Sequence, residues 1–210
     1  MLRNEMATSL DYHPACPALF WLSDWLKVIY SGDYKAFLGM IEGKSDEDIQ
    51  KMISKRETLW NVSAIFHVVL GARVLQSDDD DDPVVFETKR NCRKNLNVKN
   101  EHEKILVKLL SLGCDVNVRD FIGFTPLHHC CNQFGNPVTL KLARRLIRAG
   151  AKVNAISRVG STPILEATHN LKYDIVEMLI ENGANPYLRD NDDISAFRLV
   201  IRLRGGKSIF

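Results

Sequence analysis

The feature that most constrains this chain is a segment that repeats itself between Asp120 and Tyr187. Thr125-Pro126-Leu127-His128 aligns with Thr162-Pro163-Ile164-Leu165, and Gly150-Ala151 aligns with Gly183-Ala184. A third start, at Ser195, follows Thr162 by 33 positions. A period of this length is typical of repeat architectures, in which one unit cannot bury its own apolar face and neighbouring units stack to form a core. We therefore expect an elongated stack of similar units.

The residues of each unit predict two helices. Thr125 and Thr162 are expected N-caps, because a threonine hydroxyl can accept from the first-turn amides. Proline follows each of them at the first helical position, where a missing N–H costs nothing. Glycines close the second helices, where a left-handed residue is wanted. The second helices carry apolar side chains at helical spacing, namely Leu142, Leu146 and Ile147 in one unit and Ile175, Met178, Leu179 and Ile180 in the next.

The period and the Thr-Pro-Leu-His motif resemble the ankyrin repeat, a turn followed by two antiparallel helices. The resemblance covers residues 20–203 in outline, and its specific motifs lie within 109–195. It implies an all-α ankyrin-repeat solenoid with short hairpin loops between stacked helix pairs.

On this basis the chain divides into a tail, a repeat domain and a second tail. The expected segments are an N-terminal tail 1–19, an ankyrin-repeat domain 20–203 and a C-terminal tail 204–210. Within the domain we expect a cap 20–55, a degenerate repeat 56–117, repeats 118–154 and 155–187, and a partial repeat 188–203. The partial repeat has no second helix, which favours a truncated or shortened form of a longer product.

An insert at 77–100 interrupts the degenerate repeat. It begins with five aspartates, Asp78 to Asp82, and continues with a basic cluster from Lys89 to Lys99. Dense like charge does not pack, so we expect a solvated loop. A docking site for a partner and a phosphorylation site at Ser77 are the alternatives.

Composition excludes several classes of function. The 210 residues carry a net charge of +2, which gives no case for nucleic acid or an acidic membrane as partner. No apolar run approaches the roughly 18 residues needed to span a bilayer, and we find no secretory signal. Five scattered cysteines fit reduced thiols in the cytosol or the nucleus. We expect a monomer.

A cluster of His128, His129, Cys130 and Cys131 suggests chemistry at first sight. Adjacent helical side chains point about 100° apart, however, so the four cannot converge on one ion. The ankyrin resemblance implies a structural role for His128, with hydrogen bonds to neighbouring backbone, and places the two cysteines at positions of small core residues. No catalytic or phosphate-binding motif is present. We therefore expect neither an enzyme nor a metal or cofactor.

The resemblance implies protein binding, with contacts from hairpin tips and first helices. Phe121, Ile122 and Phe124 are either exposed hot-spot residues or residues that pack against the neighbouring hairpin. The expected contact residues are Arg119, Phe121, Ile122, Phe124, Asn132, Gln133, Ile156, Arg158, Val159, Ser161, Glu166, His169, Asn170, Arg189, Asn191 and Asp192.

Two other functions are compatible with the sequence. The chain is expected either to act alone as a scaffold or to form the ankyrin part of a larger regulator, such as an ankyrin–MYND or ankyrin–SOCS-box protein. Asn117 and Asn154 also resemble the ankyrin asparagines that asparaginyl hydroxylases modify. The alternative is that each asparagine holds its own hairpin.

Overall fold

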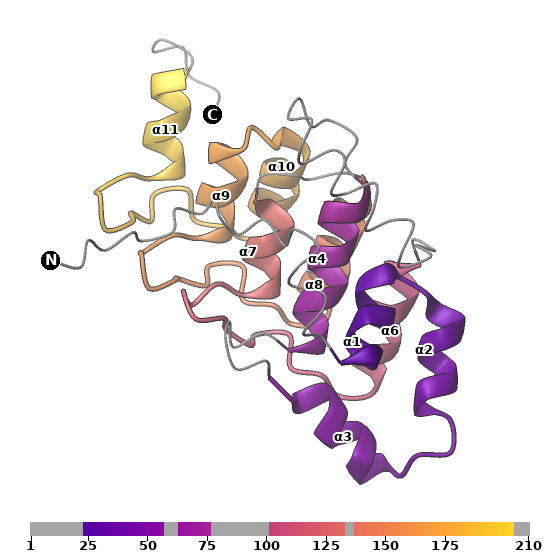
Figure 1. The fold of residues 1–210 in the computed structure, drawn as a ribbon. Coiled ribbons are helices and arrows are strands. Elements are labelled where there is room, and N and C mark those ends of the chain that lie inside the picture. Colours follow the sequence, from indigo (N-terminus) through magenta and orange to yellow (C-terminus); the bar gives the residue numbers. More distant parts are fainter. Residues whose placement is uncertain (1–22, 57–62, 77–100, 133–136, 204–210) are drawn as a thin grey trace, which may run out of the picture.

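A computed structural model describes residues 23–56, 63–76, 101–132 and 137–203 (Figure 1). The predicted insert 77–100 with Ser77, both predicted tails, and Gln133 lie outside the described residues. The helices are α1 (Asp24–Ser31), α2 (Tyr34–Ile41), α3 (Asp46–Ser54), α4 (Ala64–Gln76), α6 (His102–Ser111), α7 (Pro126–Cys131), α8 (Pro137–Arg148), α9 (Pro163–His169), α10 (Tyr173–Glu181) and α11 (Ala196–Leu203).

The helices form two layers. The first helices of successive units, α1, α4, α7, α9 and α11, contact one another in that order and make the inner layer. The second helices α2, α6, α8 and α10 likewise follow one another in the outer layer. In Figure 1 the stack runs from the indigo α1 and α2 to the yellow α11. The expected all-α solenoid of stacked helix pairs is confirmed.

The helix starts follow the predicted capping chemistry. Thr162 Oγ1 accepts from Leu165 N, and Thr125 forms a capping box with His128. Asp33 caps α2 by accepting from the amide of Ala36 at 2.9 Å. Ser45 caps α3, because its Oγ accepts from Asp48 N at 3.2 Å.

Apolar stripes on both layers meet in one core. The buried members from the outer layer include Ile105, Leu106, Leu109, Leu142, Leu146, Ile175, Met178 and Leu179. The tightest helix contact joins α1 to α4: a Cβ at Gly71 would lie 2.1 Å from the carbonyl oxygen of Tyr30. Only glycine lets these two backbones approach so closely.

The first two units differ from the later ones in their linker. Helix α3 occupies the linker and packs on α4 at the lower end of the stack in Figure 1. Gln50 Nε2 on α3 donates to the carbonyl of Leu112 at 2.6 Å, which ties α3 to the next hairpin. The buried His102 Nε2 donates to Tyr30 O at 2.9 Å and so joins α6 to α1.

None of the helices in the described part of the chain combines the length and the apolar character that a membrane crossing requires.

Candidate functional site: the hairpins and first helices

Three hairpins of the same construction project between the later repeats. Each contains a backbone bond of 2.9 Å across its ends: Asp120 N to Phe124 O, Ser157 N to Ser161 O, and Asp190 N to Ile194 O. A second backbone bond closes the turn of each: Gly123 N to Asp120 O, Gly160 N to Ser157 O, and Asp193 N to Asp190 O. The last hairpin also contains an antiparallel bridge between Arg189 and Ser195. The chain therefore presents a row of equivalent tips along one side of the stack.

The first residue of each hairpin folds the tip with its own side chain. Asp120 Oδ1 accepts from Ile122 N at 2.9 Å and from Phe124 N at 2.8 Å. Asp190 Oδ1 accepts from the amides of Asp192 and Ile194 at 3.0 and 2.9 Å. In the middle hairpin Ser157 Oγ accepts from Ser161 N at 3.0 Å. Aspartate and serine suit this role because their short side chains reach backbone amides two to four residues on.

Hydrogen bonds also join one tip to the next. Arg158 N donates to Ile122 O at 2.9 Å, and Asn191 N donates to Val159 O at 3.2 Å. Gly160 adopts φ +78°, and a Cβ there would lie 2.7 Å from Asn191 N, so the close approach requires glycine. The tips are thus held in one fixed arrangement.

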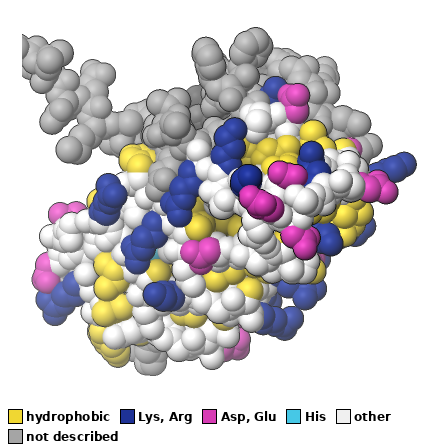
Figure 2. Space-filling view, turned by 90° about the horizontal axis from the view of Figure 1, so that it is seen from below, with side chains coloured by type: hydrophobic (Ala, Val, Ile, Leu, Met, Phe, Trp, Pro, Cys, Tyr) yellow, Lys and Arg dark blue, Asp and Glu magenta, His cyan; other side chains and the backbone are white. Residues whose placement is uncertain are grey.

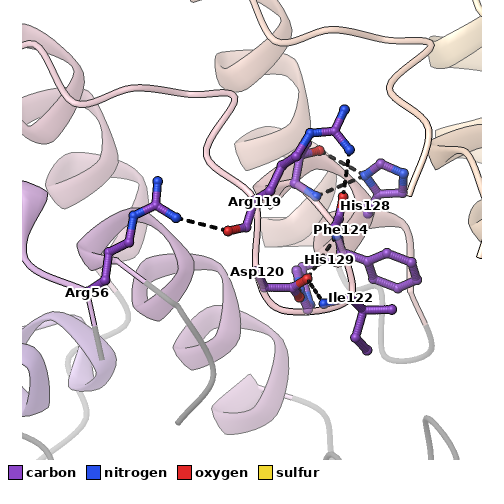
Figure 3. Close-up of polar contacts among 9 residues, drawn as sticks. Arg56, Arg119, Asp120, Ile122, Phe124, His128 and His129 are labelled. Atoms are coloured by element: carbon purple, nitrogen blue, oxygen red, sulfur yellow. Dashed lines mark hydrogen bonds and ion pairs between the residues drawn. The ribbon is translucent and has the colours of Figure 1, made fainter. Parts of the chain in front are cut away.

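Arginine side chains add further hydrogen bonds between the hairpins. Arg119 Nη1 donates to the carbonyl oxygens of Gly123 at 3.2 Å and of Ile156 at 2.6 Å. Its own carbonyl accepts from Arg56 Nη1 at 3.1 Å, as Figure 3 shows. Arg119 therefore connects the end of α3 with two successive hairpins.

His128 is a structural residue with a defined tautomer. The amide of Thr125 donates to Nδ1 at 3.1 Å, so the proton lies on Nε2, which donates to Ser161 O at 3.2 Å (Figure 3). Burial lowers the pKa of His128 to about 4, so the imidazole is neutral at pH 7. The position thus has the backbone-bonding role implied by the ankyrin resemblance.

His129 ties the first helix to the hairpin. Its Nε2 lies 2.8 Å from Asp120 Oδ2, and both side chains are buried. The rings of Phe66 and Phe124 meet the imidazole edge-to-face at 5.4 and 5.7 Å. Sequence reasoning did not find this pair, although the aspartate that opens the hairpin and the histidine on α7 were both visible.

The remaining members of the His/Cys cluster do not form a reactive site. Cys130 and Cys131 are fully buried, and burial raises the pKa of the Cys131 thiol well above its ordinary value. A thiol of this kind is a poor nucleophile, because the thiolate is the reactive form. Across the ranges that the structure describes, no group of three or more His, Cys, Asp or Glu side chains is arranged to hold a metal ion.

The predicted contact residues divide into an exposed set and a buried set. Phe124 is buried, being 7% exposed, and its ring stacks at 5.0 Å on His128 of the following helix α7 rather than on a neighbouring hairpin. Ser161 is also buried, and its hydroxyl donates to Glu166 Oε1. Ile122, Asn132, Glu166 and Asn170 are half-buried. The exposed members are Arg119, Phe121, Ile156, Arg158, Val159, His169, Arg189, Asn191 and Asp192.

We use the term hairpin face for the exposed side chains of the tips, which are Arg119, Phe121, Ile156, Arg158, Val159, Arg189, Asn191 and Asp192. Three of them are apolar: Phe121 is 38% exposed, and Ile156 and Val159 are each 48% exposed. From below the stack, hydrophobic side chains and Lys or Arg side chains lie interspersed over the surface (Figure 2). The face therefore combines apolar contacts with positive charge.

Asn117 and Asn154, the two expected modification sites, hold successive repeats together. Asn117 Nδ2 donates to Gly150 O at 3.1 Å, and its Oδ1 accepts from Lys152 N at 2.8 Å. Asn154 makes the equivalent pair with Gly183 O and Asn185 N at 2.9 and 2.8 Å. Both side-chain amides thus bond to the loop of the following repeat rather than to their own hairpin, and modification of either asparagine stays a prediction.

Comparison with known proteins shows similarity to one family of repeats and to several larger proteins. The family described as ankyrin repeats (3 copies) matches residues 95–190. Human SMC5-SMC6 complex localization factor protein 1 is 31% identical over 96 residues, which cover 45% of this chain and 9% of that protein. Human BCL-6 corepressor-like protein 1 is 27% identical over 130 residues, which cover 56% of this chain and 7% of that protein.

A shorter viral relative is covered more fully. The putative ankyrin repeat protein FPV230 of Fowlpox virus is 30% identical over 128 residues, covering 45% of this chain and 68% of the viral protein. The segment that the family model matches consists of stacked helix pairs with intervening hairpins. The chain belongs to the ankyrin-repeat proteins.

Proposed function

We propose that this chain is a non-enzymatic interaction module that binds a protein partner through its hairpin face. The observation that carries the proposal is the row of exposed apolar side chains, Phe121, Ile156 and Val159, on two hydrogen-bonded tips. Ankyrin repeats generally mediate protein–protein interaction, and this row supplies apolar contact area for such an interaction.

The rigidity of the tips supports this use. Backbone bonds between hairpins and the side chains of Asp120 and Arg119 already order the face, so association sacrifices little conformational entropy. The aliphatic and aromatic residues stand beside Arg119 and Arg158, and protein interfaces are enriched in aromatic and arginine anchors. We therefore expect an apolar contact with a partner whose rim is acidic.

The proposal concerns binding by this segment alone. One relative is named for localising the SMC5–SMC6 complex, and another is named as corepressor-like. The matched segments cover only 9% and 7% of those proteins. By analogy we propose a scaffold or adaptor role, with the cytosol or the nucleus as its compartment.

The test compares two double variants of matched chemistry. Phe121→Ser/Val159→Ser removes apolar area from the hairpin face, whereas Tyr173→Ser/Ile180→Ser removes comparably exposed side chains from α10. Phe124 is unsuitable for this purpose because it is buried. Both variants are first checked for wild-type helicity by circular dichroism and for an unchanged urea midpoint.

Each protein is then used for affinity capture from cell lysate with quantitative mass spectrometry. We expect a partner that is retained by the wild type and by the α10 variant and is lost from the hairpin variant. Retention of the same partners by both variants would show that the hairpin face is not the binding surface.

A further inference from the structure

The outer layer carries a second charged surface that the hairpin face does not include. We define the basic face by six side chains on two neighbouring helices: Lys104 and Lys108 of α6, and Lys141, Arg144, Arg145 and Arg148 of α8. Helices α6 and α8 contact one another side by side in the outer layer. Five of the six residues are exposed and Lys108 is half-buried.

Much of this charge is uncompensated. Arg145 Nε pairs with Glu103 Oε1 at 3.0 Å, and Lys104 pairs with Glu101 one turn away on the same chain segment. Within the described residues, no carboxylate pairs with Lys108, Lys141, Arg144 or Arg148. Arg144 and Arg148 also stand one helical turn apart, where like charges repel. A ligand of opposite charge would relieve this repulsion.

A shallow cavity lies within the basic face. It has a volume of about 300 Å³ and is lined by Tyr34, Glu103, Lys104, Val107, Lys108, Ser111 and Arg145. Val107 is 43% exposed although it is apolar, and the Lys104 ammonium stands 6.0 Å from the centre of the Tyr34 ring. The cavity therefore combines an apolar floor with three cationic side chains, Lys104, Lys108 and Arg145, and one carboxylate, Glu103, which pairs with Arg145.

Acidic side chains set the limits of this surface. On one side the outer face of α10 exposes Asp174, Glu177 and Glu181, and α10 is the neighbour of α8. On the other side Glu101 stands at the N-cap of α6, whereas Glu103 lines the cavity and is neutralised by Arg145. From Lys141 to Arg148 the positive stretch is about 10 Å long, which matches about three or four extended residues.

The short length of the basic face and the carboxylates beside it determine which class of polyanion can bind there. A nucleic acid strand or an anionic bilayer would extend past the basic face and meet the carboxylates of α10, which repel it. A short acidic peptide segment fits between the carboxylates, and one apolar side chain in it would enter the cavity beside Val107. We propose that the basic face of α6 and α8 docks a short acidic segment of a partner protein that carries an apolar anchor residue.

The inference is independent of the hairpin face. Its probe is a fluorescein-labelled tetrapeptide of two glutamates, one leucine and one glutamate, titrated with the full chain and followed by fluorescence anisotropy. Saturable binding is expected, weakening as salt rises because the charges are exposed.

The variant that tests the site is Lys108→Gln/Arg144→Gln/Arg148→Gln. A matched control, Lys44→Gln/Lys51→Gln/Lys55→Gln, removes the same charge from exposed residues on and beside α3. We expect at least a tenfold loss of affinity in the first variant and less than a twofold change in the control. Phe121→Ser/Val159→Ser should keep full affinity, which separates this site from the hairpin face. Equal losses in both triple variants would overturn the proposal, since they would indicate attraction to net charge alone.

Two further binding measurements identify what kind of ligand occupies the basic face. Tighter binding of a labelled single-stranded oligothymidylate than of the peptide would overturn the choice of an acidic polypeptide. If the wild type fails to bind and the variant with Asp78 to Asp82 all changed to asparagine does bind, the chain's own aspartate run is the occupant, and the partner proposal is wrong. Peptide binding by the wild type at a site lost only in the α6/α8 variant would support it.

Discussion

His129 Nε2 lies 2.8 Å from Asp120 Oδ2 in a pair that is almost completely buried. This contact joins the first helix of a repeat to the hairpin that precedes it, so the position of the tip depends on the helix. The same aspartate also accepts from two backbone amides of the hairpin. One side chain thus positions both the tip and the apolar residues that it presents.

Asp120→Ala is expected to lower the free energy of unfolding by about 3 kcal/mol, because the buried donors Phe124 N and His129 Nε2 and the part-buried donor Ile122 N lose their acceptor at once. Asp190→Ala is the matched control: it removes the same two backbone bonds from a half-buried hairpin in which no histidine partner is present. We expect a loss of about 1 kcal/mol there. Urea denaturation measures both, and equal losses would show that the His129 contact adds nothing.

Two helical glycines should respond to alanine with opposite signs. A Cβ at Gly71 would lie 2.1 Å from the Tyr30 carbonyl oxygen, whereas Gly39 in α2 is exposed and has nothing within 4 Å. Gly71→Ala must push α1 and α4 apart, and we expect a loss of about 2 kcal/mol or more. Gly39→Ala should gain about 0.5–1 kcal/mol from helix propensity. Thermal unfolding of both variants gives the answer, and a stable Gly71→Ala protein would contradict the close packing.

Stability should fall as the pH is lowered from about 6.5 to about 4. Burial lowers the pKa of His67, His102 and His128 to about 4 in the folded chain, against about 6.5 when unfolded. Between these values the unfolded chain binds more protons, so acid favours unfolding. Each histidine contributes up to about 1.4 kcal/mol per pH unit. Urea midpoints measured from pH 8 to pH 4 test this, and equal midpoints at pH 7 and pH 5 would contradict it.

His67 provides a sharper version of the same experiment. Both of its ring nitrogens are buried and have no hydrogen-bond partner among the residues that the structure describes. His67→Leu should therefore raise the free energy of unfolding at pH 7 by about 1 kcal/mol and also reduce the acid sensitivity. His128→Leu is the control: it removes the bonds to Thr125 and Ser161 and should destabilise by about 2 kcal/mol at pH 7. Destabilisation of His67→Leu to the same extent would show that His67 has a partner after all.

Local chemistry made most of the fold predictable. Thr125 and Thr162 cap their helices as their residue type and the following prolines indicate. The apolar residues expected at helical spacing in the second helices, among them Leu142, Leu146 and Ile175, are buried in the core. These features depend on residues a few positions apart, which a sequence displays directly.

The candidate site was less predictable, because it depends on how one repeat meets the next. Phe121 and Phe124 are both aromatic residues of one hairpin, yet Phe121 is exposed while Phe124 packs on His128 and His129. Ser161 is buried by the histidine of the preceding repeat. The sequence contains no local signal for either outcome, since both depend on contacts between units.

The central claim is protein binding through the hairpin face, and site-specific photo-crosslinking tests it most directly. A photoreactive amino acid is placed at Val159 on the hairpin face or at Tyr173 on α10; these side chains are 48% and 58% exposed. The account predicts a discrete protein adduct from position 159 in cells and no such adduct from position 173. Adducts from position 173 alone, or the same adducts from both positions, would contradict it.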